Sequence, residues 1–128
     1  MTRQEFNNIS GKILDSSITV HQLMGPGLLE AVYEYCLAKE LMIRGIQVQR
    51  QVYLPLIYKG EVLNKDFRID LLICNEIIIE IKSVDSIIPV HEAQIISYLK
   101  LSRLKLGFLI NFNVPLIKNG FRRFVNNF

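Results

Sequence analysis

Asp70, Glu80 and Lys82 interrupt an otherwise apolar stretch, residues 67–83, which reads FRIDLLICNEIIIEIKS. Carboxylate oxygens are the ligands that Mg²⁺ and similar hard cations prefer, so two acids in such a setting suggest a divalent-cation site. Both arms of the stretch are dense in Ile and Leu, which predicts two strands joined by a turn at residues 74–76. Side chains alternate along a strand, and Glu80 and Lys82 therefore share one face.

The length of the turn decides whether Asp70 joins them. A three-residue turn makes Asp70 and Glu80 opposite each other in an antiparallel hairpin, with β-carbons roughly 5 Å apart. Two carboxylates at that distance repel each other, more strongly on an apolar sheet, and a divalent cation would remove the repulsion. The alternative is a solvated face on which Lys82 forms a weak ion pair. The residues around the acids are more apolar than an ordinary solvated face, which favours the cation site.

The composition indicates one domain, residues 1–128, because half of the 128 residues are hydrophobic and can build a core. No apolar run approaches the ~20 residues of a membrane span, and the polar start MTRQEFNN does not resemble a signal peptide. Cys36 and Cys74 lack metal-ligand spacing. We expect both to be buried thiols of a cytoplasmic protein.

Charge is unevenly distributed along the chain. Residues 1–92 carry 9 basic and 12 acidic side chains, a balance of −3, whereas residues 93–128 carry 6 basic and no acidic ones, a balance of +6. This asymmetry suggests a polyanionic partner such as nucleic acid, with Arg122 and Arg123 as candidate contacts. A solvated basic surface, or a basic segment facing the acidic half of the same fold, is an equally weighted alternative.

Periodicity and chain breaks predict the remaining elements. Helices are expected at residues 4–24, 28–44 and 89–103, and further strands at 46–58, 106–111 and 120–126. Pro55 indicates an edge position or a bend within its strand. The order α-α-β-β-β-α-β-β predicts an α/β fold with a mixed central sheet, and it places the acid-bearing hairpin at the centre of that sheet.

Two of the predicted helices carry further candidate site residues. At about 100° per residue, Glu30 falls on the apolar side of the second helix, where a carboxylate costs several kcal/mol unless it is paired or bound. Glu34 lies one turn on at the edge of that side, and Glu40 also falls within it. The helix pattern alone favours an inward salt bridge of Glu30 over a functional role. On the third helix Gln94 and Tyr98 share a face, which can equally be an amphipathic boundary.

Several motifs in order resemble a known family. Residues 27–33, GLLEAVY, match the signature of the GxxExxY family, and the family's other motifs follow at YKG (58–60), FRIDLL (67–72), IIIEIKS (77–83), HEAQIISYL (91–99) and GFLINF (107–112). The resemblance runs from about His21 to Arg123. That family resembles a compact, RecB-like branch of the PD-(D/E)XK nuclease superfamily. The resemblance implies a restriction-endonuclease-like αβββαβ core, with a mixed central sheet flanked by helices.

The same resemblance implies a metal-dependent nuclease acting on nucleic acid, with DNA as the expected substrate. Asp70 matches the motif aspartate and Glu80-Ile81-Lys82 match (D/E)-X-K, although Ile69 replaces the proline of the motif's name. Asp70, Glu80 and the carbonyl of Ile81 would hold Mg²⁺ or Mn²⁺, and Lys82 would orient or deprotonate the attacking water.

The helix residues also match positions of this superfamily. Glu30 matches a glutamate that many of these nucleases add to the metal shell. Gln94 and Tyr98 resemble the Q-x3-Y element that helps to place the DNA strand. His21 and His91 are expected to be capping or supporting residues rather than metal ligands.

Two other functions stay open. One is a catalytically silent domain of the same fold that binds nucleic acid or a partner protein. The other is a metal-dependent phosphodiesterase that acts on nucleotides or RNA. A homodimer, or a partner protein that supplies specificity, is compatible with each.

Overall fold

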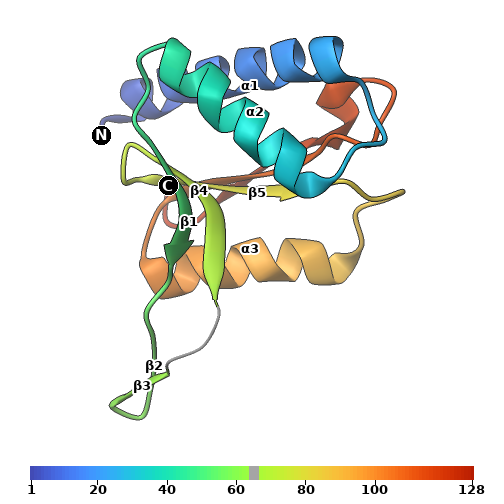
Figure 1. Ribbon diagram of the computed structural model, residues 1–128. Coiled ribbons are helices and arrows are strands. Elements are labelled where there is room, and N and C mark those ends of the chain that lie inside the picture. Colours follow the sequence, from blue (N-terminus) through green and yellow to red (C-terminus); the bar gives the residue numbers. More distant parts are fainter. Residues whose placement is uncertain (64–66) are drawn as a thin grey trace.

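The computed structural model describes residues 1–63 and 67–128, and within these residues three α-helices flank a five-stranded sheet. Helices α1 (Arg3–Met24) and α2 (Glu30–Ile43) lie on one side of the sheet, and α3 (Pro89–Ser102) lies on the other (Figure 1). The three predicted helices are thus confirmed to within two residues at each end. Within the described residues no helix is both long enough and apolar enough to cross a membrane.

The sheet is mixed, as predicted, and its strand order is β1-β4-β5-β6-β7. Its strands are β1 (Val48–Tyr53), β4 (Arg68–Ile73), β5 (Ile77–Lys82), β6 (Leu106–Asn111) and β7 (Phe121–Val125). A short 3-10 helix, η1 (Ile117–Gly120), precedes β7. Strands β5 and β6 are parallel, joined through α3, and the other neighbours are antiparallel. The acid-bearing strand β5 is therefore central and β4 lies beside it.

The predicted strand at residues 46–58 is divided in the structure. Strand β1 ends at Tyr53, and β2 (Leu56–Tyr58) pairs with β3 (Glu61–Leu63) in a separate two-stranded ribbon. Pro55 lies in the break, as the expected bend requires, because proline cannot donate to a strand ladder. The ribbon projects away from the sheet in Figure 1. Strand β3 was not predicted from the sequence.

Two apolar layers hold the helices on the sheet. On the α1 and α2 side, the ring of Tyr33 stacks on Phe112 with 4.6 Å between ring centroids. On the α3 side, Ile95 and Leu99 pack with Ile78 of β5. Strand β5 is buried on both faces, which explains its nearly unbroken run of isoleucine. Cys36 and Cys74 are free thiols and half-buried, so the expectation that both are buried was wrong.

Candidate active site

The predicted hairpin is formed by β4 and β5, and its turn comprises residues 74–76. Ile73 pairs with Ile77 and Leu71 with Ile79, so the register directs Asp70 toward Glu80 as expected. Cys74 and Asn75 adopt positive φ angles of 52° and 58°, which closes the turn tightly.

The β4–β5 pairing ends at Leu71 and Ile79. Beyond that pair, the side-chain carboxylates of Asp70 and Glu80 accept hydrogen bonds from backbone N–H groups. The backbone N–H of Ile81 donates to Asp70 Oδ2 at 2.8 Å, and the backbone N–H of Asp70 donates to Glu80 Oε1 at 3.3 Å. The two strands therefore part at the acids, and each acid satisfies a backbone donor that the ladder leaves unpaired. This interlock, the pair of contacts just described, holds the Asp70 carboxylate at the Ile81 N–H and the Glu80 carboxylate at the Asp70 N–H.

Burial and proximity make two negative charges costly here. Glu80 is only 4% exposed, and burial, followed by repulsion from Asp70, raises the pKa of its carboxyl group to about 9. Burial also raises the pKa of Asp70, against the hydrogen bond from Ile81, and the charge of Glu34 adds to the rise. The charge of Lys82 lowers both pKa values but does not outweigh burial, so the two acids remain costly to ionise together.

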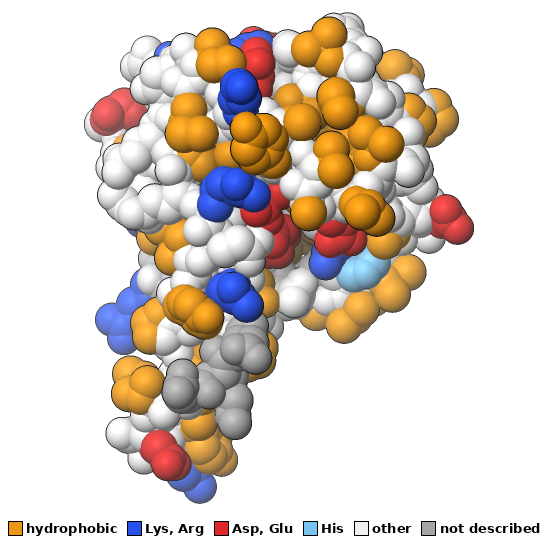
Figure 2. Space-filling view, viewed as in Figure 1, with side chains coloured by type: hydrophobic (Ala, Val, Ile, Leu, Met, Phe, Trp, Pro, Cys, Tyr) orange, Lys and Arg blue, Asp and Glu red, His pale blue; other side chains and the backbone are white. Residues whose placement is uncertain are grey.

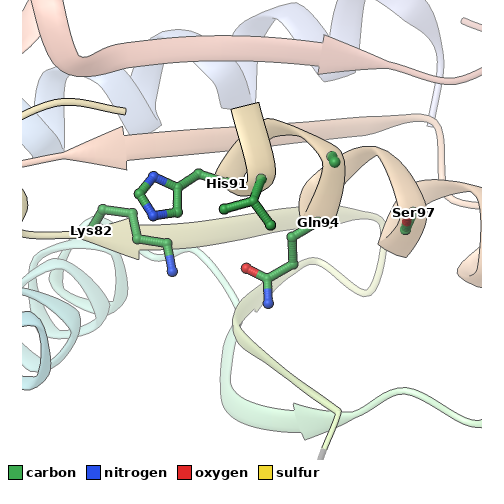
Figure 3. A pocket seen from close by; sticks show the side chains of 6 residues that line it. Lys82, His91, Gln94 and Ser97 are labelled. Carbon is green, nitrogen blue, oxygen red and sulfur yellow. The ribbon is translucent and has the colours of Figure 1, made fainter. Parts of the chain in front are cut away.

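Lys82 lies at the end of β5 and lines a hollow of about 460 Å³ between that strand and α3. His91, Gln94 and Ser97 of α3 line the same hollow (Figure 3). In Figure 2, acidic side chains are visible in the recessed centre of the face shown, with basic side chains beside them. Acidic and basic side chains therefore lie next to one another on this face.

Gln94 and Tyr98 are brought together as predicted, since the Gln94 amide donates to the Tyr98 hydroxyl at 3.1 Å. Tyr98 is 5% exposed and belongs to the apolar layer under α3. Burial, with repulsion from Glu80 next, raises the pKa of its hydroxyl. Gln94 is the member of the pair that lines the hollow, and Tyr98 supports it from beneath.

Glu30 is exposed, so the prediction that it lies on the packed face was wrong. Its direction around α2 agrees with that of the buried Leu37 and Leu41, but Glu30 is the first residue of the helix and extends past the core. The apolar pattern identified the direction correctly and could not show where the helix begins. Among the described residues, no three His, Cys, Asp or Glu side chains cluster in a way that could hold a metal ion.

Glu34, one turn further along α2, is the buried acid of this helix at 6% exposure. The guanidinium of Arg50 donates to Glu34 Oε2 at 3.0 and 3.2 Å, and the amide of Gln51 donates to Oε1 at 2.5 Å. The inward salt bridge that was considered for Glu30 is therefore found at Glu34 instead. The helical period places Glu34 at the edge of the apolar side, and the sequence therefore did not identify it as the buried acid or as a site residue.

Gln51 connects this ion pair to the acids of the hairpin. Its amide nitrogen also donates to Asp70 Oδ1, at 3.3 Å. The backbone of Gln51 has a φ of 52°, in the left-handed region that a glutamine rarely adopts, and the β1–β4 register omits the pair that Gln51 would form with Asp70. Such strain is kept where surrounding contacts enforce it. No signal in the strand pattern marked this residue.

The segment before α2 is held against the end of β5. The hydroxyl of Tyr33 donates to the carbonyl of Gly25 at 2.5 Å and accepts from the Leu28 N–H at 3.0 Å. The Ser83 hydroxyl, one residue past Lys82, donates to the carbonyl of Leu28 at 2.5 Å. Gly27 within this segment has a φ of 94°, which requires glycine. The glycine and tyrosine of the GLLEAVY motif therefore shape the rim of the site.

The basic residues near the C-terminus are dispersed rather than gathered at the acids. Arg122 forms an ion pair with Glu92 of α3, whereas Arg123 lies over the Phe128 ring, 4.7 Å from its centroid. Adjacent residues of a strand point to opposite faces, so Arg122 and Arg123 do not act on one surface. Lys100, Arg103 and Lys105 line a separate hollow at the far end of α3 from His91. His21 bonds the carbonyl of Val114 at 2.7 Å, in keeping with a supporting role.

The donor set fits a hard divalent cation. Asp70 and Glu80 offer two carboxyl groups, Asp70 Oδ2 accepts from the Ile81 N–H, and burial raises the pKa of both acids, so a bound cation would offset the cost of ionising them. Lys82 is the nearby cation of the motif and lies towards the hollow.

Comparison with known proteins gives a family for the chain. The family model of the PD-(D/E)XK nuclease superfamily matches residues 7–124, which include every residue of the interlock. No curated protein and no solved structure matches the chain.

Proposed function

The chain belongs to the PD-(D/E)XK nuclease superfamily, and we propose on this basis that it is a Mg²⁺- or Mn²⁺-dependent nuclease that hydrolyses phosphodiester bonds, with DNA as the expected substrate. The observation that carries the proposal is the interlock at the parting of β4 and β5, in which Asp70 accepts from the Ile81 N–H and Glu80 from the Asp70 N–H. A sheet that only needed stability would continue its ladder with apolar side chains here.

Asp70, Glu80 and the carbonyl of Ile81 would hold the cation. When bound, such a cation activates water as a nucleophile and polarises the phosphoryl oxygen. The Ile81 N–H keeps Asp70 Oδ2 in place, and Gln51 keeps Oδ1 in place. Both oxygens are thus oriented before a metal arrives, which lowers the reorganisation that catalysis requires.

Lys82 would orient the attacking water and offset the charge that builds up on the phosphoryl group. Its position at the mouth of the hollow gives it access to a strand that lies along α3. Gln94, supported by Tyr98, would contact that strand on the side of the helix.

The direct test is cleavage of end-labelled single-stranded and double-stranded DNA with Mg²⁺ and with Mn²⁺. An Asp70→Asn protein purified in the same way is the matched control, because the substitution keeps side-chain size. Cleavage by the wild type alone supports the proposal. Equal cleavage by both proteins indicates a contaminating nuclease, and metal-dependent DNA binding without cleavage indicates the catalytically silent function.

Two further substrates test the assignment to DNA. Equal cleavage of RNA oligonucleotides would widen the substrate class to nucleic acids in general. Hydrolysis of a dinucleotide as fast as of a long strand would instead favour a phosphodiesterase that acts on nucleotides.

A further inference from the structure

His91 is a feature that the proposed chemistry leaves without a role. It is the third residue of α3, and the backbone N–H of Ile88, the residue that precedes the helix, donates to His91 Nδ1 at 3.2 Å. A backbone N–H can only donate, so Nδ1 must offer its lone pair. The neutral imidazole therefore carries its proton on Nε2, and the helix cap fixes this tautomer.

The ring lines the hollow beside the acids. Lys82 of β5 and Gln94 of α3 converge with His91 around this space, and Ser97 lies one turn further along the helix (Figure 3). His91 and Gln94 are three residues apart and thus lie on the same face of α3. Glu92, the acid next to His91, is engaged by Arg122.

Four of the six residues that line the hollow carry a hydrogen-bond donor in the side chain. The residues that form it are Lys82, Val90, His91, Ala93, Gln94 and Ser97, and none of them is acidic. An ammonium, an N–H, an amide and a hydroxyl are the groups that bind a phosphate oxygen. The first turn of α3 adds the partial positive charge of a helix start, although a helix start alone would not select an anion.

We propose that the Nε2–H of His91 donates a hydrogen bond to a non-bridging oxygen of a phosphodiester group next to the one that is cleaved. The inference rests on the proposed nuclease function and adds a substrate contact to it. In this arrangement Lys82 contacts the phosphate that is cleaved, and His91 contacts the next phosphate along the nucleic-acid strand. The hollow between β5 and α3 is then the path of the strand, and α3 provides one wall of that path.

Capping of α3 alone would also explain why a histidine occupies position 91. The test must therefore separate capping from phosphate binding. Glutamine and glutamate at the third position of a helix both accept a hydrogen bond from the capping N–H. His91→Gln thus keeps the cap and a donor amide, whereas His91→Glu keeps the cap and replaces the donor with a negative charge. Melting temperatures of both variants no lower than that of the parent would establish that the cap is preserved.

Binding is measured by the anisotropy of a fluorescein-labelled oligonucleotide, with Asp70→Asn as the common background so that cleavage cannot interfere. We expect His91→Gln to bind within about twofold of the parent and His91→Glu to bind at least about tenfold more weakly, as the loss of a hydrogen bond to a charged group implies. Equal affinity of both variants and the parent would assign His91 to capping alone.

A negative charge could weaken binding from a distance, and a second measurement distinguishes contact from repulsion. Single phosphates of the oligonucleotide are replaced in turn by neutral methylphosphonates. For the parent protein, the positions that the protein contacts should weaken binding, and one of them, next to the scissile phosphate, should lose its effect in His91→Ala. An effect of similar size at every position in both proteins would overturn the inference.

The two proposals fail in different ways. DNA cleavage by the otherwise wild-type protein together with unchanged binding by His91→Glu would reject the role of His91 and keep the nuclease. Absence of both oligonucleotide binding and cleavage would reject both proposals.

Discussion

The backbone N–H of Asp70 donates to the carboxylate of Glu80 at 3.3 Å, at the level where the β4–β5 ladder ends. This contact ties the position of one acid to that of the other, because moving Glu80 removes a hydrogen bond from the strand that carries Asp70. Stability and metal binding are therefore coupled at these two residues, and both can be measured.

Stability without metal should fall as the pH rises. The pKa of Glu80 is raised from 4.5 to about 9 in the folded protein, mainly by burial. Between these values the folded state holds a proton that the unfolded chain has lost, so raising the pH favours unfolding. The slope for one such proton is at most about 1.4 kcal/mol per pH unit. Urea denaturation from pH 5 to pH 9 in EDTA measures it.

Glu80→Gln is the control for this pH dependence. The amide is neutral at every pH, so the variant should lose most of the slope while it keeps the shape of the side chain. A slope as steep as that of the wild type would place its origin at another group.

Divalent metal should raise the melting temperature. A ligand that binds only the folded state at 100 times its dissociation constant stabilises it by about 2.7 kcal/mol, which corresponds to several degrees in a domain of this size. Scanning calorimetry with and without 10 mM Mg²⁺ or Mn²⁺ checks this. Asp70→Asn should lose most of the shift, and a shift retained in that variant would locate the metal elsewhere.

Replacing Lys82 should abolish cleavage without unfolding the protein. Its side chain is half-buried at the end of β5 and is not part of the apolar layers. We expect Lys82→Ala to lower the cleavage rate by at least about a hundredfold, in the range seen when a charge-stabilising group is removed. Lys100→Ala, an exposed lysine on α3, should cleave normally and serves as the matched control.

Gln51 should affect metal affinity and stability in separable ways. Gln51→Gly and Gln51→Ala both remove the amide that donates to Asp70, so both should weaken Mn²⁺ binding several-fold in calorimetric titration. Only glycine adopts a φ of 52° without strain. Gln51→Gly should therefore be more stable than Gln51→Ala by about 1 kcal/mol. Alanine at least as stable as glycine would argue against backbone strain at this position.

The hairpin was predictable because its information is local. The three-residue turn and the alternation along both arms determine which residues meet, so the facing of Asp70 and Glu80 followed from the sequence alone. Residues 106–111, an unbroken apolar run between a helix and a polar segment, were likewise identified as a strand to the residue.

The rest of the site depends on contacts between distant segments. Whether Glu30 or Glu34 is buried depends on where α2 begins relative to the sheet, which the helical period does not determine. Gln51 reaches Glu34 and Asp70 only because β1 pairs with β4 along the edge of the hairpin. Nothing in the sequence distinguishes a glutamine that contacts two acids from any other polar residue of an edge strand.

The Ile81 N–H, which donates to Asp70 Oδ2 at 2.8 Å, has a further consequence. An amide proton bonded to a carboxylate shifts its resonance when that carboxylate gains a proton or binds a cation. In ¹⁵N-labelled protein, the Ile81 cross-peak is thus a built-in spectroscopic reporter of the ionisation of Asp70, read without a substrate and without a substitution in the site.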